Sequence, residues 1–260
     1  MTNKKMRYKM MEFFAKDFNC NAEDFLSDRN KVISHNDPTA ELFRMKCFGN
    51  AVVVNAHEKL CDWFNYFVSK YVGYRCFDGT QISLISRELA KYDCTVSCGQ
   101  GALPDMAFIR KNAYSSHNMR IFKKNEIENF YKDEIYGSFY PNKEEWHMLD
   151  YEDDTEYIVA YYEQDIVAGF ATADRCTDKI YEIGYETLPE YQQKGIATAL
   201  TVEMTNLLLG MDIIPYAGFA WSHIASKNTV IKSGYVMAWS NMGTCDKDDW
   251  AIKLYRGEAE

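Results

Sequence analysis

The segment from Ile180 to Leu200 holds the residues of this chain whose types and order best suit chemistry. A run of β-forming residues ends at Thr187-Leu188, Pro189 prevents the strand from continuing, and a helix is expected to begin near Gln192. The first turn of a helix has backbone N–H groups without intrahelical partners, and these groups form the positive end of the helix dipole. Such a turn binds phosphate or pyrophosphate. The sequence therefore predicts an anion site at this strand-to-helix junction.

Small residues and one positive charge in the same turn fit an anion. Gly195 and Ala197 leave the backbone open to close approach, and Lys194 adds a flexible cation. The alternative is an ordinary helix start with a glycine in its first turn, because one Gly and one Ala are common. Local spacing alone does not decide between the two.

The order of residues around this turn resembles motif A of the GNAT superfamily of acyl-CoA-dependent N-acetyltransferases. The motif has the signature Arg/Gln-x-x-Gly-x-Gly/Ala after a strand, and residues Pro189 to Ala197 fit it. Downstream, the stretch from His223 to Tyr235 is similar to the family segment Asn-x-x-Ser-x-x-x-x-x-Lys-x-Gly-Phe, with Ser226 and Gly234 in register and His223 in place of the family's Asn. Together the two matches cover about residues 119–256. The chain thus resembles a two-domain member of the superfamily, with the resemblance confined to its C-terminal part.

The resemblance implies acetyl-CoA as co-substrate and no metal. The pyrophosphate is expected over Gln193 to Thr198 and the pantetheine arm along Tyr185 to Leu188, with Ser226 near the sulfur end. The implied cofactor-binding residues are Tyr185, Glu186, Thr187, Leu188, Gln192, Gln193, Lys194, Gly195, Ile196, Ala197, Thr198 and Ser226.

Attack of an amine on a thioester needs a base for the amine proton and donors for the oxyanion. Glu182 lies near the position at which some family members carry a strand carboxylate that acts as general base. Glu186 is expected on the same face of the strand as Glu182, because side chains alternate with a period of two. For each, a solvated strand carboxylate is the alternative. Many relatives carry a tyrosine acid where this chain has Asn228 to Ile231. Tyr235, Ser226 or water is then left to protonate the leaving thiolate.

The leading prediction is an N-acetyltransferase that moves acetyl from acetyl-CoA to a primary amine of a small molecule or peptide, by direct attack in a ternary complex. A catalytically silent acyl-CoA-binding or regulatory module is the alternative, because the helix tyrosine is missing. A structural or interaction domain with an empty junction is the third. The expected partner is the acceptor amine, and a homodimer is left open.

Composition excludes two classes of partner. The 29 basic and 38 acidic residues give a net charge of −9, which suits a nucleic-acid backbone poorly. No apolar run approaches the ~20 residues that a membrane span needs. The N-terminus lacks the features of a secretory signal, and the eight cysteines show no disulfide-framework spacing, so we expect free thiols and a cytoplasmic location. Cys94 and Cys98 lack the matched second pair that zinc sites use.

The fold class expected from these patterns is α/β. Residues 119–260 are expected to form the acyl-CoA N-acyltransferase (GNAT) fold, a mixed and mostly antiparallel sheet with helices on both faces. Its strands are predicted at 155–163, 166–173, 179–188, 213–221, 235–240 and 250–255, and its main helices at 191–209 and 223–232.

Residues 1–118 are expected to form a smaller α/β domain, with a degenerate GNAT-like unit as one option. The polar stretch from Lys111 to Asn118 marks the boundary. The patterns predict helices at 6–18, 57–71 and 80–92, a strand around Val52 to Val54, a loop from Ser97 to Asp105 and a short strand from Met106 to Ile109. We expect this domain to wall one side of the acceptor pocket.

Overall fold

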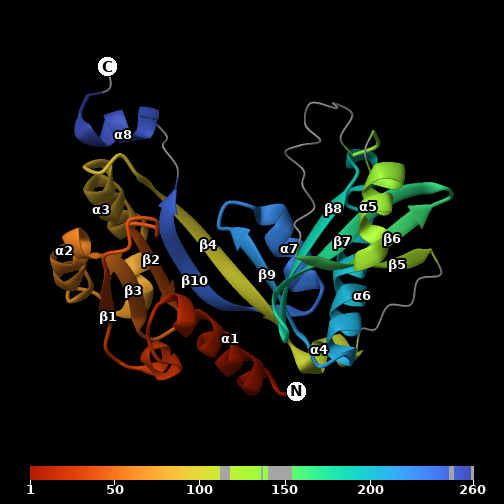
Figure 1. Ribbon diagram of the computed structural model, residues 1–260, viewed down its shortest axis with the longest axis horizontal. Coiled ribbons are helices and arrows are strands. Elements are labelled where there is room, and N and C mark those ends of the chain that lie inside the picture. The colour runs from red at the N-terminus through yellow and green to blue at the C-terminus, as the bar shows by residue number, and fades with distance from the viewer. Residues whose placement is uncertain (112–117, 136, 140–153, 246–248, 259–260) are drawn as a thin grey trace. The chain divides into compact units, whose positions relative to one another are not determined.

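The computed structural model describes residues 1–111, 118–135, 137–139, 154–245 and 249–258 of the 260-residue chain (Figure 1). The contacts divide it into two compact units. The first unit contains Met1–Asn3, Ala102–Gly218 and His223–Val236, and the second unit contains Lys4–Gly101, Phe219–Ser222 and Met237–Glu260. Three strands have residues in both units: β4 (Thr95–Pro104), β9 (Ile214–Ala220) and β10 (Tyr235–Cys245).

The first unit is built on a mixed sheet with the strand order β9-β8-β7-β6-β5. Neighbouring strands are antiparallel except β8 and β9, which are parallel. The further strands of this sheet are β5 (Met119–Lys123), β6 (Thr155–Glu163), β7 (Ile166–Thr177) and β8 (Ile180–Thr187). The helices are α4 (Met106–Lys111), α5 (Lys124–Phe130), the π-helix η3 (Tyr131–Ile135), the 3-10 helix η5 (Pro189–Tyr191), α6 (Ile196–Gly210) and α7 (Ile224–Lys232).

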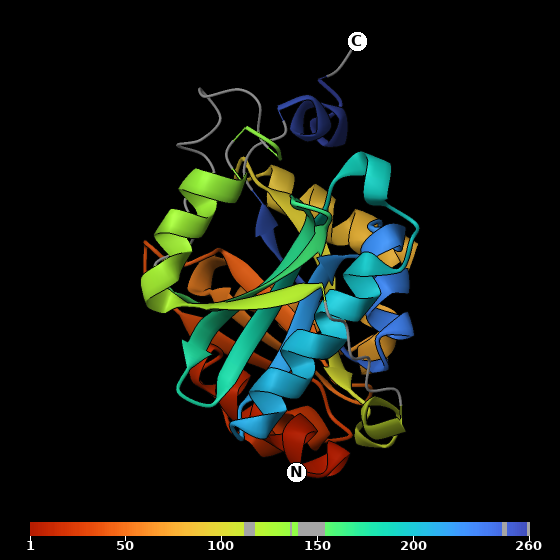
Figure 2. The ribbon, with the colours of Figure 1, turned by 90° about the vertical axis from the view of Figure 1, so that its right-hand side faces the viewer.

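Different helices cover the two faces of this sheet (Figure 2). Phe170 of β7 packs with Ile127 and Phe130 in one apolar cluster, on the face covered by α5. A side chain at the neighbouring position, Gly169, would point to the other face, because side chains alternate along a strand. There a Cβ on Gly169 would lie 3.2 Å from Ile196 Cγ2 of α6. These contacts confirm the predicted α/β class, with a mostly antiparallel sheet and helices on both faces.

The second unit has the strand order β1-β3-β2-β10. Its elements are α1 (Asn3–Asp17), η1 (Ala22–Leu26), β1 (Lys31–His35), β2 (Phe43–Cys47), β3 (Val52–His57), α2 (Glu58–Val68), η2 (Gly73–Phe77), α3 (Gly79–Ala90) and α8 (Asp249–Arg256). Phe43 and Met45 of β2 join Phe64 of α2 and Leu89 of α3 in the main apolar core. The alternate residues of β2 face the opposite way, toward the side of α1, where the ammonium of Lys46 lies 3.0 Å from the ring centroid of Phe14.

The predicted loop over Ser97 to Asp105 is wrong, since most of it is strand β4. Its glycines serve packing. A Cβ on Gly101 would lie 1.9 Å from Trp239 Cζ2, so only glycine allows the indole to pack on this strand.

The predicted strand at Met106 to Ile109 is also wrong, because these residues belong to α4. Asp105 supplies an N-cap. Its carboxylate accepts the Ala107 N–H at 2.9 Å, and its carbonyl accepts the N–H groups of Phe108 and Ile109.

The predicted strand at 250–255 is helix α8. The alternation of Trp250, Ile252 and Leu254 suggested a strand, but the next residue, Arg256, ties the segment to the end of α3. Its guanidinium donates to Ala90 O at 2.9 Å and pairs with Asp93 at 2.9 Å. Tertiary contacts of this kind override weak local preferences.

The expected boundary stretch at 111–118 lies largely outside the described residues, which omit 112–117. Residues 102–111 have their contacts in the first unit and residues 237–245 and 249–258 in the second. The division into folding domains 1–118 and 119–260 stays a prediction. All eight cysteines are free thiols. Within the described ranges, no helix combines the length and apolar character needed to cross a membrane.

Candidate functional site

The turn between β8 and α6 is formed by two left-handed residues. Gln193 has φ 61° and Gly195 has φ 85°, and Gly195 is the N-cap of α6. The helix therefore begins at Ile196, four to five residues after the predicted start at 191–192. A left-handed conformation costs a residue with a Cβ roughly 1–2 kcal/mol, so Gln193 marks a strained position beside the predicted anion site.

The first turn of α6 presents unpaired backbone donors. The N–H groups of Gly195, Ile196, Ala197 and Thr198 have no acceptor among the described residues, and no side chain caps the helix. The next N–H, that of Ala199, donates to Gly195 O at 3.0 Å. Apart from its chain neighbours, no atom lies within 4 Å of the place that a Cβ on Gly195 would take. An open set of four donors at the positive helix end is the geometry of an anion site.

Two side chains of the turn support this arrangement. Gln192 Nε2 donates to Thr187 O at 3.3 Å, which ties the turn to the end of β8. Lys194 Nζ lies 4.7 Å from the ring centroid of Tyr191. Lys194 makes no ion pair within the described part of the chain, so its charge is available to an anion.

Strands β8 and β9 diverge beside this turn. They pair in register only from Ile180 to Glu182 and from Ile214 to Tyr216. On its other side β8 stays paired with β7 as far as Thr187. Beyond Glu182, one backbone edge of β8 therefore has no strand partner among the described residues. An extended ligand can add to such an edge as a further strand does.

Tyr185 and Ser226 meet next to the open edge of β8. The Tyr185 hydroxyl donates to Ser226 O at 2.9 Å and lies 2.7 Å from Ser226 Oγ. Burial raises the pKa of Tyr185, although the hydrogen bond to Ser226 opposes this. The phenol is thus protonated at neutral pH and able to donate a proton. The structure brings together two residues from distant segments of the sequence, Tyr185, which was predicted to contact the pantetheine arm, and Ser226, which was predicted to lie near the sulfur end.

Glu182 lies where the β8–β9 pairing ends. The Tyr216 hydroxyl donates to Glu182 Oε2 at 2.7 Å, and it also lies 3.4 Å from Cys176 Sγ. Burial raises the pKa of Tyr216, and the nearby Glu182 raises it further, so the phenol stays a donor to the carboxylate. Gly218 leaves room for that carboxylate, since a Cβ there would lie 2.6 Å from Glu182 Oε1. Sequence reasoning missed Tyr216, Gly218 and Cys176, because only the strand register reveals them.

Glu186 shares a face of β8 with Glu182, as the strand period predicts. In the β7–β8 register, Glu186 lies opposite Phe170 and Glu182 opposite Asp174. The two differ in exposure: Glu182 is half-buried and Glu186 is exposed.

Tyr235 is placed in the interior of the first unit. Its side chain is 3% exposed, and its hydroxyl lies 2.7 Å from Thr205 Oγ1 in α6. Thr205 Oγ1 donates onward to Thr201 O at 2.6 Å, so Tyr235 is the donor to Thr205. Burial raises the pKa of Tyr235. In the described part of the chain no hydrogen bond joins Tyr235 to Ser226 or Glu182.

This arrangement predicts unequal stability losses for two single substitutions. Thr205→Val leaves the Tyr235 hydroxyl buried without an acceptor, which should cost about 1–3 kcal/mol of unfolding free energy. Tyr235→Phe keeps the bond from Thr205 to Thr201 and should cost less, about 0.5–1.5 kcal/mol. Urea unfolding of both variants and of the double variant measures the difference. Equal losses, or a large fall in turnover for Tyr235→Phe at unchanged stability, would contradict a structural role for this hydroxyl.

Residues 124–217 match the family model described as Acetyltransferase (GNAT) family. A comparison with curated proteins finds no match.

Solved structures to which part of this chain is similar include an acetyltransferase from the GNAT family of Colwellia psychrerythraea (12% identity, TM-score 0.45, 58% of this chain and 56% of that one). A putative GNAT acetyltransferase of Novosphingobium aromaticivorans is 12% identical, with TM-score 0.42, over 59% of this chain and 66% of that one. Each of these two matches thus spans less than two thirds of this chain and less than two thirds of the matched protein. The aminoglycoside N-acetyltransferase AAC(6')-Iy in complex with CoA is 15% identical, with TM-score 0.34, over 46% of this chain and 92% of that one.

The matched segment contains the turn after β8 and helix α6. It also contains the place where β8 and β9 diverge, and Gly218 is the next residue after its end. Residues 124–217 are thus similar to the GNAT acetyltransferase family, a similarity that implies acyl transfer from acyl-CoA.

Proposed function

We propose that this protein is an N-acetyltransferase that moves the acetyl group of acetyl-CoA to a primary amine of a small molecule or peptide, by direct attack in a ternary complex. The observation that carries the proposal is the set of N–H groups from Gly195 to Thr198, which have no acceptor in the described part of the chain and lie beside the open edge of β8. An elongated molecule with a diphosphate at its middle and an amide-containing arm matches both features. Acetyl-CoA has this chemistry.

The proposed placement of acetyl-CoA follows from two sets of backbone groups, those at the start of α6 and those on the open edge of β8. The diphosphate takes the four N–H groups at the start of α6, with Lys194 adding its charge. The pantetheine arm lies along Tyr185 to Leu188 and pairs with the backbone edge that β9 leaves open. Its sulfur end then approaches Ser226.

Each group has a step in the proposed chemistry. Glu182 accepts the proton of the attacking amine as the N–C bond forms, and Tyr216 keeps the carboxylate in place. N–H groups on the open edge of β8 stabilise the oxyanion. The C–S bond then breaks, and the Tyr185–Ser226 pair supplies a proton to the leaving thiolate. Holding both reactants in one site supplies much of the rate.

Two linked measurements test the proposal. Calorimetric titration with acetyl-CoA should show one site, and acetyl-pantetheine, which lacks the diphosphate, should bind at least about tenfold more weakly, given 1.5–3 kcal/mol for a charged hydrogen bond. A thiol-release assay with a panel of small amines and peptide N-termini then identifies the acceptor. No binding of acetyl-CoA would refute the proposal. Binding without thiol release for any amine would support a catalytically silent acyl-CoA-binding module instead.

A further inference from the structure

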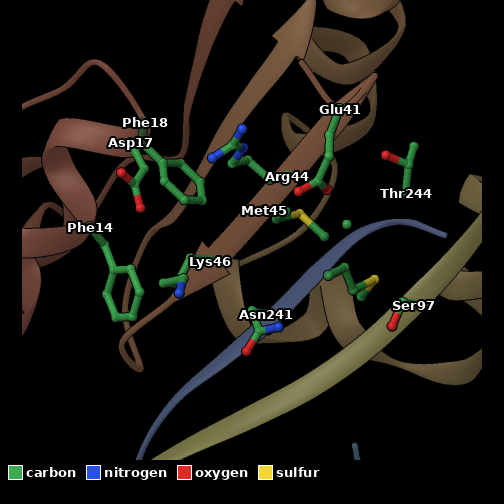
Figure 3. Close-up of a pocket in the computed structure, with 12 residues that line it drawn as sticks. Phe14, Asp17, Phe18, Glu41, Arg44, Met45, Lys46, Ser97, Asn241 and Thr244 are labelled. Carbon is green, nitrogen blue, oxygen red and sulfur yellow. The ribbon is translucent and has the colours of Figure 1, made fainter. Parts of the chain in front are cut away.

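The second unit contains a pocket of its own, between α1 and the strands β2 and β10 (Figure 3). Its volume is ≈ 330 Å³, which lies within the range of small-molecule sites. The side chains that give it its character are two aromatic, two acidic and two basic ones: Phe14, Phe18, Asp17, Glu41, Arg44 and Lys46. All of the residues that line it belong to the second unit.

Arg44 is the unusual residue of this pocket. Its Nε is buried and has no hydrogen-bond partner among the described residues. Asp17 and Glu41 line the same pocket, yet Arg44 forms an ion pair with neither of them. A buried guanidinium N–H without an acceptor is unfavourable, and most such groups in native proteins are satisfied. An acceptor from outside the chain would satisfy it.

The strand pattern explains why two cations face this pocket. Phe43 and Met45 of β2 point into the apolar core, so Arg44 and Lys46 point together toward α1 (Figure 3). Lys46 is 8% exposed and its ammonium lies over the ring of Phe14. The positive charges are thus deep in the pocket.

The negative charges of the pocket lie at its surface. Asp17 at the end of α1 and Glu41 before β2 are both exposed. The charges of the two cations and the two carboxylates cancel, so the pocket has no net charge, and the carboxylates repel a dianion such as phosphate. A planar guanidinium matches a carboxylate with two parallel hydrogen bonds. The distribution suits a molecule with a carboxylate at its inner end and an ammonium at its outer end.

We propose that this pocket binds a free amino acid as its zwitterion. The carboxylate accepts hydrogen bonds from the buried Nε–H and from a terminal N–H of Arg44, and the ammonium lies toward Asp17 and Glu41. Phe14 and Phe18 provide an apolar wall for the side chain. The site is distinct in its residues from the proposed acetyl-CoA site, and no bond is made or broken in it.

The test follows the Arg44 Nε–H resonance by ¹H–¹⁵N NMR of the full chain, assigned with the Arg44→Gln variant. The neutral protein amino acids are titrated singly up to about 10 mM, a range that reaches millimolar Kd values. At least one should shift the resonance saturably. Its amide, which lacks the carboxylate, should bind at least tenfold more weakly, and its deaminated acid should bind more weakly than the amino acid. No saturable shift with any amino acid, equal binding of the amide, or a response to inorganic phosphate alone would overturn the proposal.

Matched variants separate binding from folding. Arg44→Met removes the buried donor and should abolish the thermal stabilisation that the bound amino acid gives. Arg75→Gln should keep it, because Arg75 is an exposed arginine of the same unit that pairs with Asp78 at 3.1 Å. Without ligand, Arg44→Met should unfold at the same temperature as the parent or about 2–4 °C higher. A clear fall of that midpoint would make Arg44 a structural residue and overturn the proposal. None of these measurements uses acetyl-CoA, so failure here leaves the proposed acetyltransferase untouched.

Discussion

Conversion of Glu182 to glutamine is expected to lower kcat for acetyl transfer about 10²–10⁴-fold, the usual contribution of a general base. The Kd for acetyl-CoA should stay unchanged, because Glu182 lies where β8 and β9 separate and not at the turn that holds the diphosphate. Glutamine keeps the shape of the side chain and still accepts the hydrogen bond of Tyr216, so the fold is preserved. Steady-state kinetics with the acceptor found in the amine panel, together with calorimetry, measures both effects.

Two variants serve as controls for this prediction. Glu186→Gln should leave kcat close to the parent value, because Glu186 is exposed on the same strand face. Tyr216→Phe should give an intermediate loss, because it removes the 2.7 Å hydrogen bond that orients Glu182 but leaves the carboxylate itself. If Glu182→Gln kept full turnover while Glu186→Gln lost it, the role of general base would pass to Glu186.

Replacing Gly195 with valine should weaken acetyl-CoA binding about 100-fold. A β-branched residue is strained at φ 85°, so the turn must shift and the N–H groups of Gly195 to Thr198 lose their common direction. The new side chain would also occupy the space that the diphosphate needs. Since no atom beyond the two adjacent residues lies within 4 Å of this Cβ position, the cost to folding should be limited to roughly 1–2 kcal/mol from the left-handed conformation.

Gly210→Ala at the other end of α6 is the matched control. Apart from its chain neighbours and the backbone of its own helix, Gly210 also has no atom within 4 Å of its Cβ position, but its φ is not in the left-handed region. Alanine there should be neutral or slightly stabilising and should bind acetyl-CoA like the parent. Calorimetry with acetyl-CoA and acetyl-pantetheine distinguishes the causes, because the Gly195 variant should lose its preference for the molecule that carries the diphosphate. Parent-like binding by Gly195→Val would remove the observation on which the proposed function depends.

The anion turn was predictable because its determinants are neighbours in the chain. Pro189 ends the strand, and Gly195 takes a conformation that residues with a Cβ avoid. The exact helix start was not predictable. Gln193 adopts the left-handed conformation that glycine usually takes, and no local preference announces it.

Elements whose shape depends on distant partners were predicted wrongly. Gly99 and Gly101 are typical of a turn, but in β4 Gly101 makes room for Trp239, which lies far along the chain. The alternating apolar residues of 250–255 are typical of a strand, yet Arg256 ties a helix to α3.

The amino-acid order alone thus determined the α/β class, the strand-to-helix turn at Gly195 and the strand face shared by Glu182 and Glu186, because each depends on residues within a few positions of one another. Tertiary structure decided which side chains meet across strands. Tyr216 and Gly218 reach Glu182 only through the parallel register of β8 and β9. The Nε of Arg44 is left without an acceptor among the described residues only because of what packs around β2. Strand register and packing depend on residues far apart in the chain, and local preferences carry no information about them.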